Sequence, residues 1–202
     1  MAGCTVRGID LIFVLDSSKS VGRTNFGKTK DFVEGVVDAF EIGSDRTRVG
    51  VIQYSSNVNF VFHLDAYMDK TLLKQAIRNI GYIGSGTRTV DALETMESEG
   101  FVVENGARRA SEGLPRVAIV ITDGQSQGAA VVVVPADRAR AKGVTIFAIG
   151  VTSNVNNDEL NAIANEPKET YIFHVSNFNA IASISASLED TTCNRKKANE
   201  FC

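Results

Sequence analysis

Two carboxylates and three hydroxyls, carried by three separate stretches of this sequence, could together bind a cation. Asp16, Ser18 and Ser20 alternate directly after an apolar run. Asp123 ends a second apolar run, and Thr87 follows a glycine-rich break before a predicted helix. An all-oxygen set suits a hard divalent cation that keeps part of its water; Mg2+ fits best, with Mn2+ and Ca2+ as alternatives. Zinc is disfavoured because no histidine or cysteine is near the set in sequence.

The first stretch alone is ambiguous, because Asp and Ser are also the favoured residues at turns and helix N-caps. The elements that carry the carboxylates favour the cation site. Residues 11–15 and 117–121 are continuous apolar runs, which is typical of strands buried on both faces of a parallel sheet. Parallel strands present their carboxyl ends at one edge, so we expect Asp16 and Asp123 to meet there.

Strand and helix patterns alternate along most of the chain. Phe26 to Phe40 has apolar positions at helical spacing, and Asn57 to Leu64 alternates strictly, as an antiparallel edge strand does. The alternation predicts an α/β fold: a doubly wound, mainly parallel six-stranded sheet with one antiparallel edge strand and helices on both faces. The other predicted strands cover residues 48–54, 144–150 and 171–175, and the other helices lie near residues 69–77, 87–97, 135–142, 158–164 and 178–188.

Two segments have weaker patterns. Four valines precede Pro135, and a proline inside a helix costs about 3 kcal/mol. We therefore predict a helix from about Pro135 to Lys142, with the valines as its entry or an irregular start. Gly100 to Pro115, which includes the Arg108-Arg109 pair, is predicted to be a helix end followed by a surface loop.

Length and composition indicate one folded domain. The chain has 202 residues, of which 44% are hydrophobic and 22% charged, with a formal net charge of −3, as in ordinary globular domains. Mild acidity disfavours non-specific nucleic-acid binding. No run approaches the roughly 18 apolar residues that span a bilayer, and no charged-then-apolar leader opens the chain. We assign a flank at 1–8, one domain at 9–190 and a tail at 191–202.

Three cysteines border the domain. Cys4 precedes the first strand, Cys193 follows the last predicted helix, and Cys202 is the final residue. This placement favours a Cys4–Cys193 disulfide that closes the ends of the domain, with Cys4–Cys202 as the alternative. The remaining cysteine would then pair with another chain or module. A disulfide implies an oxidising, extracellular compartment, so we expect a secreted protein.

The candidate cation-binding residues resemble the metal-ion-dependent adhesion site of von Willebrand factor A domains. The resemblance implies that the three hydroxyls bind the ion directly or nearly so, that the two carboxylates hold it partly through water, and that one position stays open for a ligand's Glu or Asp. It runs over about residues 10–188, and residues 10–18 with the flanking cysteines are similar to matrix modules of matrilins and fibril-associated collagens. The matching stretches are Asp16-Ser17-Ser18-Lys19-Ser20, Gly86-Thr87-Arg88-Thr89 and Ile121-Thr122-Asp123-Gly124.

The resemblance predicts an adhesion domain of the extracellular matrix, with collagen as the leading candidate partner. A phosphoaspartate enzyme is disfavoured, because the haloacid-dehalogenase pattern requires a second Asp where Ser18 stands and no general base is evident. Gly84-Ser85-Gly86 lacks the third glycine of a dinucleotide loop, and the phosphate-loop motif is absent from the sequence. A structural matrix-assembly module with an incidental metal site is the alternative, and Cys202 favours it.

Overall fold

One sheet of six strands forms the centre of the computed structural model, which describes residues 8–123, 129–151 and 155–174. The strand order is β3-β2-β1-β4-β5-β6, and β3 alone runs antiparallel to its neighbour within these residues. This confirms the predicted fold class. The strands are β1 (Asp10–Asp16), β2 (Arg48–Tyr54), β3 (Val58–Phe62), β4 (Arg116–Thr122), β5 (Val144–Gly150) and β6 (Ile172–His174).

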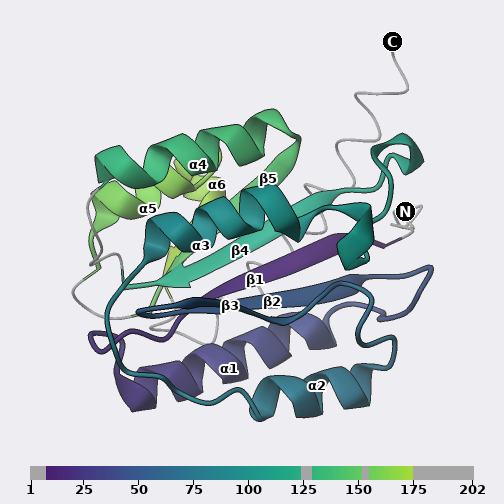
Figure 1. Ribbon diagram of the computed structural model, residues 1–202, viewed down its shortest axis with the longest axis horizontal. Helices are drawn as coiled ribbons and strands as arrows, with labels where there is room; N and C mark the ends of the chain where they lie inside the picture. The colour runs from purple at the N-terminus through teal and green to yellow at the C-terminus, as the bar shows by residue number, and fades with distance from the viewer. Residues whose placement is uncertain (1–7, 124–128, 152–154, 175–202) are drawn as a thin grey trace.

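Helices cover both faces of this sheet, as Figure 1 shows. On one face lie α1 (Gly22–Asp38) and α2 (Lys70–Arg78); on the other lie α3 (Thr89–Thr95), α4 (Ala129–Ala141) and α5 (Asn157–Ile163). Short helices complete the described part: a π-helix at Met96–Gly100, 3-10 helices at Val103–Asn105 and Ala110–Glu112, and α6 (Lys168–Tyr171), which the sequence did not predict. The predicted closing helix at 178–188 lies outside the described residues.

Strand β1 contributes to two hydrophobic cores, one on each face of the sheet. Leu11, Phe13 and Leu15 pack in the core that includes α1 and α2. Ile12 and Val14 pack in the core that includes α3, α4 and α5. Because successive side chains of a strand point to opposite faces, burial on both faces requires the continuous apolar run seen in the sequence.

The order of the strands reverses at β1. Strand β2 lies on one side of β1 and β4 on the other, and the helices that follow β1 and β4 cover opposite faces. Open α/β sheets bind ligands at such a switch point. Leu15 pairs with Ile121 in the parallel register, which brings the carboxyl ends of β1 and β4 side by side.

Helix α4 begins earlier than predicted. It starts at Ala129 and contains Pro135 inside its length, so the predicted start near Pro135 is wrong. Val132 and Ala136 are completely buried, and their packing offsets the cost of the proline. Pro135 has no N–H to donate to the carbonyl of Val131. Val131 is 42% exposed, so this residue is open to water.

The segment Gly100–Pro115 is not simply a surface loop. Arg108 is only 6% exposed, and its guanidinium lies 3.0 Å from the carboxylate of Asp10, which is 1% exposed. The backbone N–H of Arg108 donates to the same carboxylate at 2.7 Å. Burial raises the pKa of the Asp10 carboxyl, while this hydrogen bond and the charge of Arg108 lower it. The residue predicted to lie on the surface is thus half of a buried ion pair.

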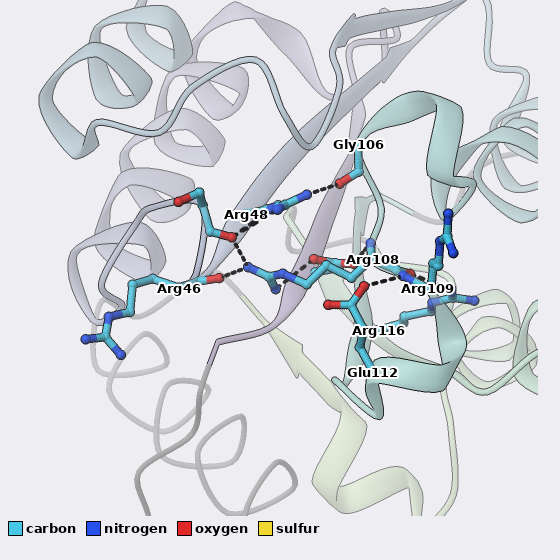
Figure 2. Close-up of polar contacts among 9 residues, drawn as sticks. Arg46, Arg48, Gly106, Arg108, Arg109, Glu112 and Arg116 are labelled. Atoms are coloured by element: carbon cyan, nitrogen blue, oxygen red, sulfur yellow. Dashed lines mark hydrogen bonds and ion pairs between the residues drawn. The ribbon is translucent and has the colours of Figure 1, made fainter.

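Neighbouring arginines extend this pair into a cluster, which Figure 2 shows. Arg48 donates to the carbonyl of Gly106 at 2.8 Å, and Arg116 donates to the carbonyl of Arg108 at 2.9 Å. Arg48 and Arg116 begin β2 and β4, so the cluster ties together the amino ends of the central strands. It lies at the edge of the sheet opposite the carboxyl ends of β1 and β4.

Candidate metal centre

Asp16 ends β1 with its carboxylate buried; the residue is 1% exposed. Its Oδ1 accepts the backbone N–H of Ser18 at 2.8 Å, and its Oδ2 accepts the hydroxyl of Thr122 at 2.9 Å. The hydroxyls of Ser18 and Ser20 lie 3.1 Å apart. The turn after β1 therefore folds back on its own strand end and brings the three predicted side chains of this stretch together.

Asp123 follows β4 and is completely buried. The pKa of the Asp16 carboxyl is raised from 3.8 to about 6, chiefly by burial; hydrogen bonds from Ser18 and Thr122 oppose the rise, and the charge of Asp123 adds to it. The two buried carboxylates thus repel each other. A divalent cation held between them would offset this repulsion, so the donor chemistry of the site fits such an ion.

A second loop, between α2 and α3, is bonded to the loop that follows β1. The backbone N–H of Gly84 donates to the carbonyl of Ser17 at 2.9 Å, and the N–H of Lys19 donates to the carbonyl of Ser85 at 2.8 Å. The N–H of Ile83 donates to the Ser17 hydroxyl at 2.9 Å. These bonds place the two loops in a fixed relation at the switch point of the sheet.

Serines after β2 anchor the same loop from the other side. The Ser55 hydroxyl accepts the N–H of Ser85 at 3.0 Å and donates to the carbonyl of Gly86 at 2.9 Å. The N–H of Gly86 donates to the Ser56 hydroxyl at 2.8 Å. Thr87 is half-buried and directly follows this anchored stretch. Its position beside the first loop is therefore set by the hydrogen bonds of its neighbours.

Tyr82 and Gly84 pack closely within this loop. The Tyr82 hydroxyl donates to the carbonyl of Ser18 at 3.1 Å. Gly84 has a φ of +74°, and a Cβ built there would lie 2.7 Å from the ring of Tyr82. Only glycine satisfies both the backbone conformation and the close approach of the ring.

Among the five predicted site residues, the structure joins Asp16, Ser18 and Ser20 through hydrogen bonds and brings Asp123 into their electrostatic environment. The sequence did not predict the roles of Ser17, Ser55 or Thr122, which support the site by hydrogen bonding. Thr122 adjoins Asp123 in the chain, and that adjacency was the one available signal. The cysteines at 4, 193 and 202 lie outside the described residues.

Other donor sets are absent from the described part of the chain. No group of three or more His, Cys, Asp or Glu side chains there could hold a metal ion. A cation at the candidate centre would therefore depend on hydroxyl oxygens as well as on the two carboxylates. No described helix is long and apolar enough to cross a membrane.

The chain is a doubly wound α/β domain with an oxygen-lined centre at the switch point, where open sheets of this kind bind ligands. The family model of the von Willebrand factor type A domain matches residues 10–187. The chain belongs to the von Willebrand factor type A family.

The chain is similar to matrilins along nearly its whole length. It is 40% identical to Matrilin-3 of Mus musculus over 190 residues, which is 94% of this chain and 39% of that protein. It is 37% identical to Matrilin-1 of Homo sapiens, over 94% of this chain and 38% of that protein. The chain thus spans about two-fifths of the length of these relatives.

Solved structures share the fold. Proximal thread matrix protein 1 from the mussel byssus superposes with a TM-score of 0.79 at 26% identity, over 92% of this chain and 48% of the other. One structure of that protein has a zinc-occupied MIDAS motif. Manganese-loaded TRAP of Plasmodium vivax gives a TM-score of 0.75 at 19% identity, over 90% of this chain and 73% of the other, which shows the fold alone.

Proposed function

We propose that this domain binds Mg2+ at Asp16, Ser18, Ser20, Thr87 and Asp123, and uses the ion to coordinate an acidic residue of an extracellular protein ligand. The observation that carries the proposal is the pair of buried, mutually repelling carboxylates at the switch point. They lie beside a turn that gathers hydroxyls. Zinc occupies the MIDAS motif in one structure of proximal thread matrix protein 1, which supports a divalent cation but not its identity.

The chemistry of the donor set explains why such an ion would bind a ligand. If hydroxyls are the direct ligands and the two carboxylates hold the ion partly through water, few anionic oxygens touch the ion and it stays electrophilic. It therefore attracts a further anionic ligand, and a carboxylate from a partner protein is a hard oxygen donor that Mg2+ accepts. The protein residues hold the ion and leave recognition to the loops around it.

We further propose that the domain is secreted, acts in the extracellular matrix and has collagen as its leading candidate ligand. Support comes from the similarity to matrilins and to a thread matrix protein. A Cys4–Cys193 disulfide, with Cys202 available to another chain, belongs to the same proposal. Mass spectrometry of a non-reduced digest would identify the pairing.

The cation is tested by calorimetry with Mg2+, Mn2+, Ca2+ and Zn2+, using wild type, Asp123→Ala and Asp31→Ala. Asp31 lies on the exposed side of α1 and serves as the charge-matched control. We expect Mg2+ binding in wild type and in the control and its loss in Asp123→Ala. Undiminished Mg2+ binding by Asp123→Ala would remove Asp123 from the site.

The adhesive function is tested by binding the same proteins to a panel of immobilised collagens and other matrix proteins, with Mg2+ and with chelator. Binding that requires Mg2+ and Asp123 supports the proposal. Binding that survives both changes would contradict it. Chelator-insensitive self-association in sizing experiments, without ligand binding, would instead indicate a structural assembly module.

The proposed role is binding and not catalysis. The described residues at the centre include no histidine or lysine in contact with Asp16, whose partners are Ser18 and Thr122. Incubation with generic phosphoester substrates and Mg2+ should release no phosphate. Release that is lost in Asp16→Asn would overturn this part of the proposal.

A further inference from the structure

Basic side chains border the candidate metal centre. Lys19 directly follows Ser18, and Arg23 lies in the first turn of α1; both are exposed. Arg88 directly follows Thr87 and forms an ion pair with Asp91. Within the described ranges, none of the ion pairs involves Lys19 or Arg23. The rim of the centre therefore carries two positive charges that the described part of the fold does not neutralise.

Arg23 is held in place relative to the centre by an aromatic ring. Its guanidinium carbon lies 5.2 Å from the centroid of the Tyr82 ring, within the range of a cation–π interaction. Tyr82 is fixed in turn, because its hydroxyl donates to the carbonyl of Ser18 and its ring lies 5.8 Å from that of buried Phe26. Arg23 is thus positioned by the same backbone that carries the proposed metal ligands.

A guanidinium that rests on a ring retains N–H groups for a planar, bidentate bond to a carboxylate. Ile83 follows Tyr82 in the chain and is 44% exposed. The surface next to the centre carries a positive charge that is fixed in position. Charge complementarity to this surface requires a ligand with negative charge beyond the one carboxylate that the ion would take.

We infer that Arg23, supported by Tyr82, is a second docking point that binds a second carboxylate of the same ligand. The ligand is then an acidic protein segment with two acidic residues at a defined spacing: one for the ion and one for Arg23. This inference rests on the proposed function, since it needs the ion as the first docking point. Within a collagen it would restrict binding to segments that present two acidic residues on one side.

The test selects peptides from a phage-displayed random library on the immobilised full chain in Mg2+ and repeats the selection on Arg23→Ala. We expect wild type to enrich two acidic positions at a fixed spacing, and Arg23→Ala to enrich one. Lys28→Ala is the matched control, because Lys28 is an exposed cation of the same helix. It should select the same two-acid pattern as wild type.

The selected peptide should bind Arg23→Ala about 10-fold to 100-fold more weakly than wild type, since a charge-assisted bond is lost. Arg23→Lys should fall between them, because lysine cannot form the bidentate bond. Tyr82→Leu should also weaken binding by removing the ring. Calorimetry should give the same Mg2+ affinity for Arg23→Ala and wild type, which separates this role from a structural effect on the centre.

Each remaining outcome has a distinct meaning. A single acidic position in wild-type selections, lost with chelator, would overturn the second docking point and leave the proposed function standing. Acidic peptides that bind equally well with chelator would overturn the proposed function. If no peptide is selected in a Mg2+-dependent way, both fail. Heparin binding that depends on Arg23, without any peptide preference, would assign the rim to a sulfated glycan and overturn the inference.

Discussion

Replacing Asp16 by asparagine should stabilise the metal-free domain at neutral pH while it abolishes stabilisation by Mg2+. The side-chain oxygen of asparagine can still accept the N–H of Ser18. The Thr122 hydroxyl, which donates to Asp16, can rotate to accept from the amide. The substitution therefore removes a buried charge and keeps the hydrogen bonds around it.

The magnitude follows from the pKa of Asp16. Burial raises this pKa from 3.8 to about 6. One pKa unit corresponds to about 1.36 kcal/mol, so the ionised carboxylate of Asp16 lowers the free energy of unfolding by about 3 kcal/mol. Between pH 4 and pH 6 the folded wild type keeps a proton that the unfolded chain has released, so its stability rises as the pH falls through 6 towards 4. The advantage of Asp16→Asn is largest above pH 6 and disappears near pH 4.

The assay is denaturant and thermal unfolding in chelator at pH 7.5, 6 and 4. For a chain of this size, about 3 kcal/mol corresponds to about 6 to 12 °C in Tm. Mg2+ at 100 times its Kd should add about 2.7 kcal/mol to wild type and almost nothing to the variant. Asp31→Asn, at an exposed position of α1, is the control and should leave all these values unchanged.

Two results would refute this reasoning. If Asp16→Asn is less stable than wild type in chelator at pH 7.5, the hydrogen bonds of the Asp16 carboxylate outweigh the cost of burying its charge. An advantage that is the same at pH 4 as at pH 7.5 would mean that it does not arise from ionisation.

Two further predictions concern stability away from the centre. Arg108→Met should cost about 3 to 5 kcal/mol in urea unfolding, because it leaves the buried Asp10 carboxylate without its guanidinium partner. The control Arg109→Met, at an exposed position, should cost less than about 0.5 kcal/mol. Equal losses in the two variants would contradict the role of the ion pair. Gly106→Ala should cost well over the roughly 1 kcal/mol expected of Gly113→Ala in thermal unfolding. Both glycines have positive φ. A Cβ at Gly106 would lie 2.5 Å from the backbone nitrogen of Asp65, whereas a Cβ at Gly113 would have no atom within 4 Å apart from those of the adjoining residues.

The sequence predicted the elements whose patterns arise locally. Strands β1, β4 and β5 are apolar runs because both of their faces are covered, and β3 alternates because it lies at the edge of the sheet. The start of α4 was mispredicted, because packing of Val132 and Ala136 outweighs the local cost of Pro135. Tertiary packing, which rules based on local sequence do not consider, determined where α4 starts.

The buried pair of Asp10 and Arg108 was missed for a related reason. The partners are far apart in sequence, and an Arg-Arg dipeptide in a polar segment has the pattern of a surface loop. A carboxylate inside the apolar run of β1 was the available signal, since a charge in a buried strand requires a partner. A different rule predicted that Asp16 and Asp123 lie near each other, because the ends of parallel strands meet at one edge of the sheet.

The close packing of Gly84 against Tyr82 has a consequence for comparing this domain with its relatives. A side chain at position 84 would displace the ring on which Arg23 rests, even where both the arginine and the tyrosine are retained. Ligand preference among related domains should therefore vary with a residue that has no side chain and touches no ligand. A comparison restricted to ligand-contacting residues would overlook the position that governs their geometry.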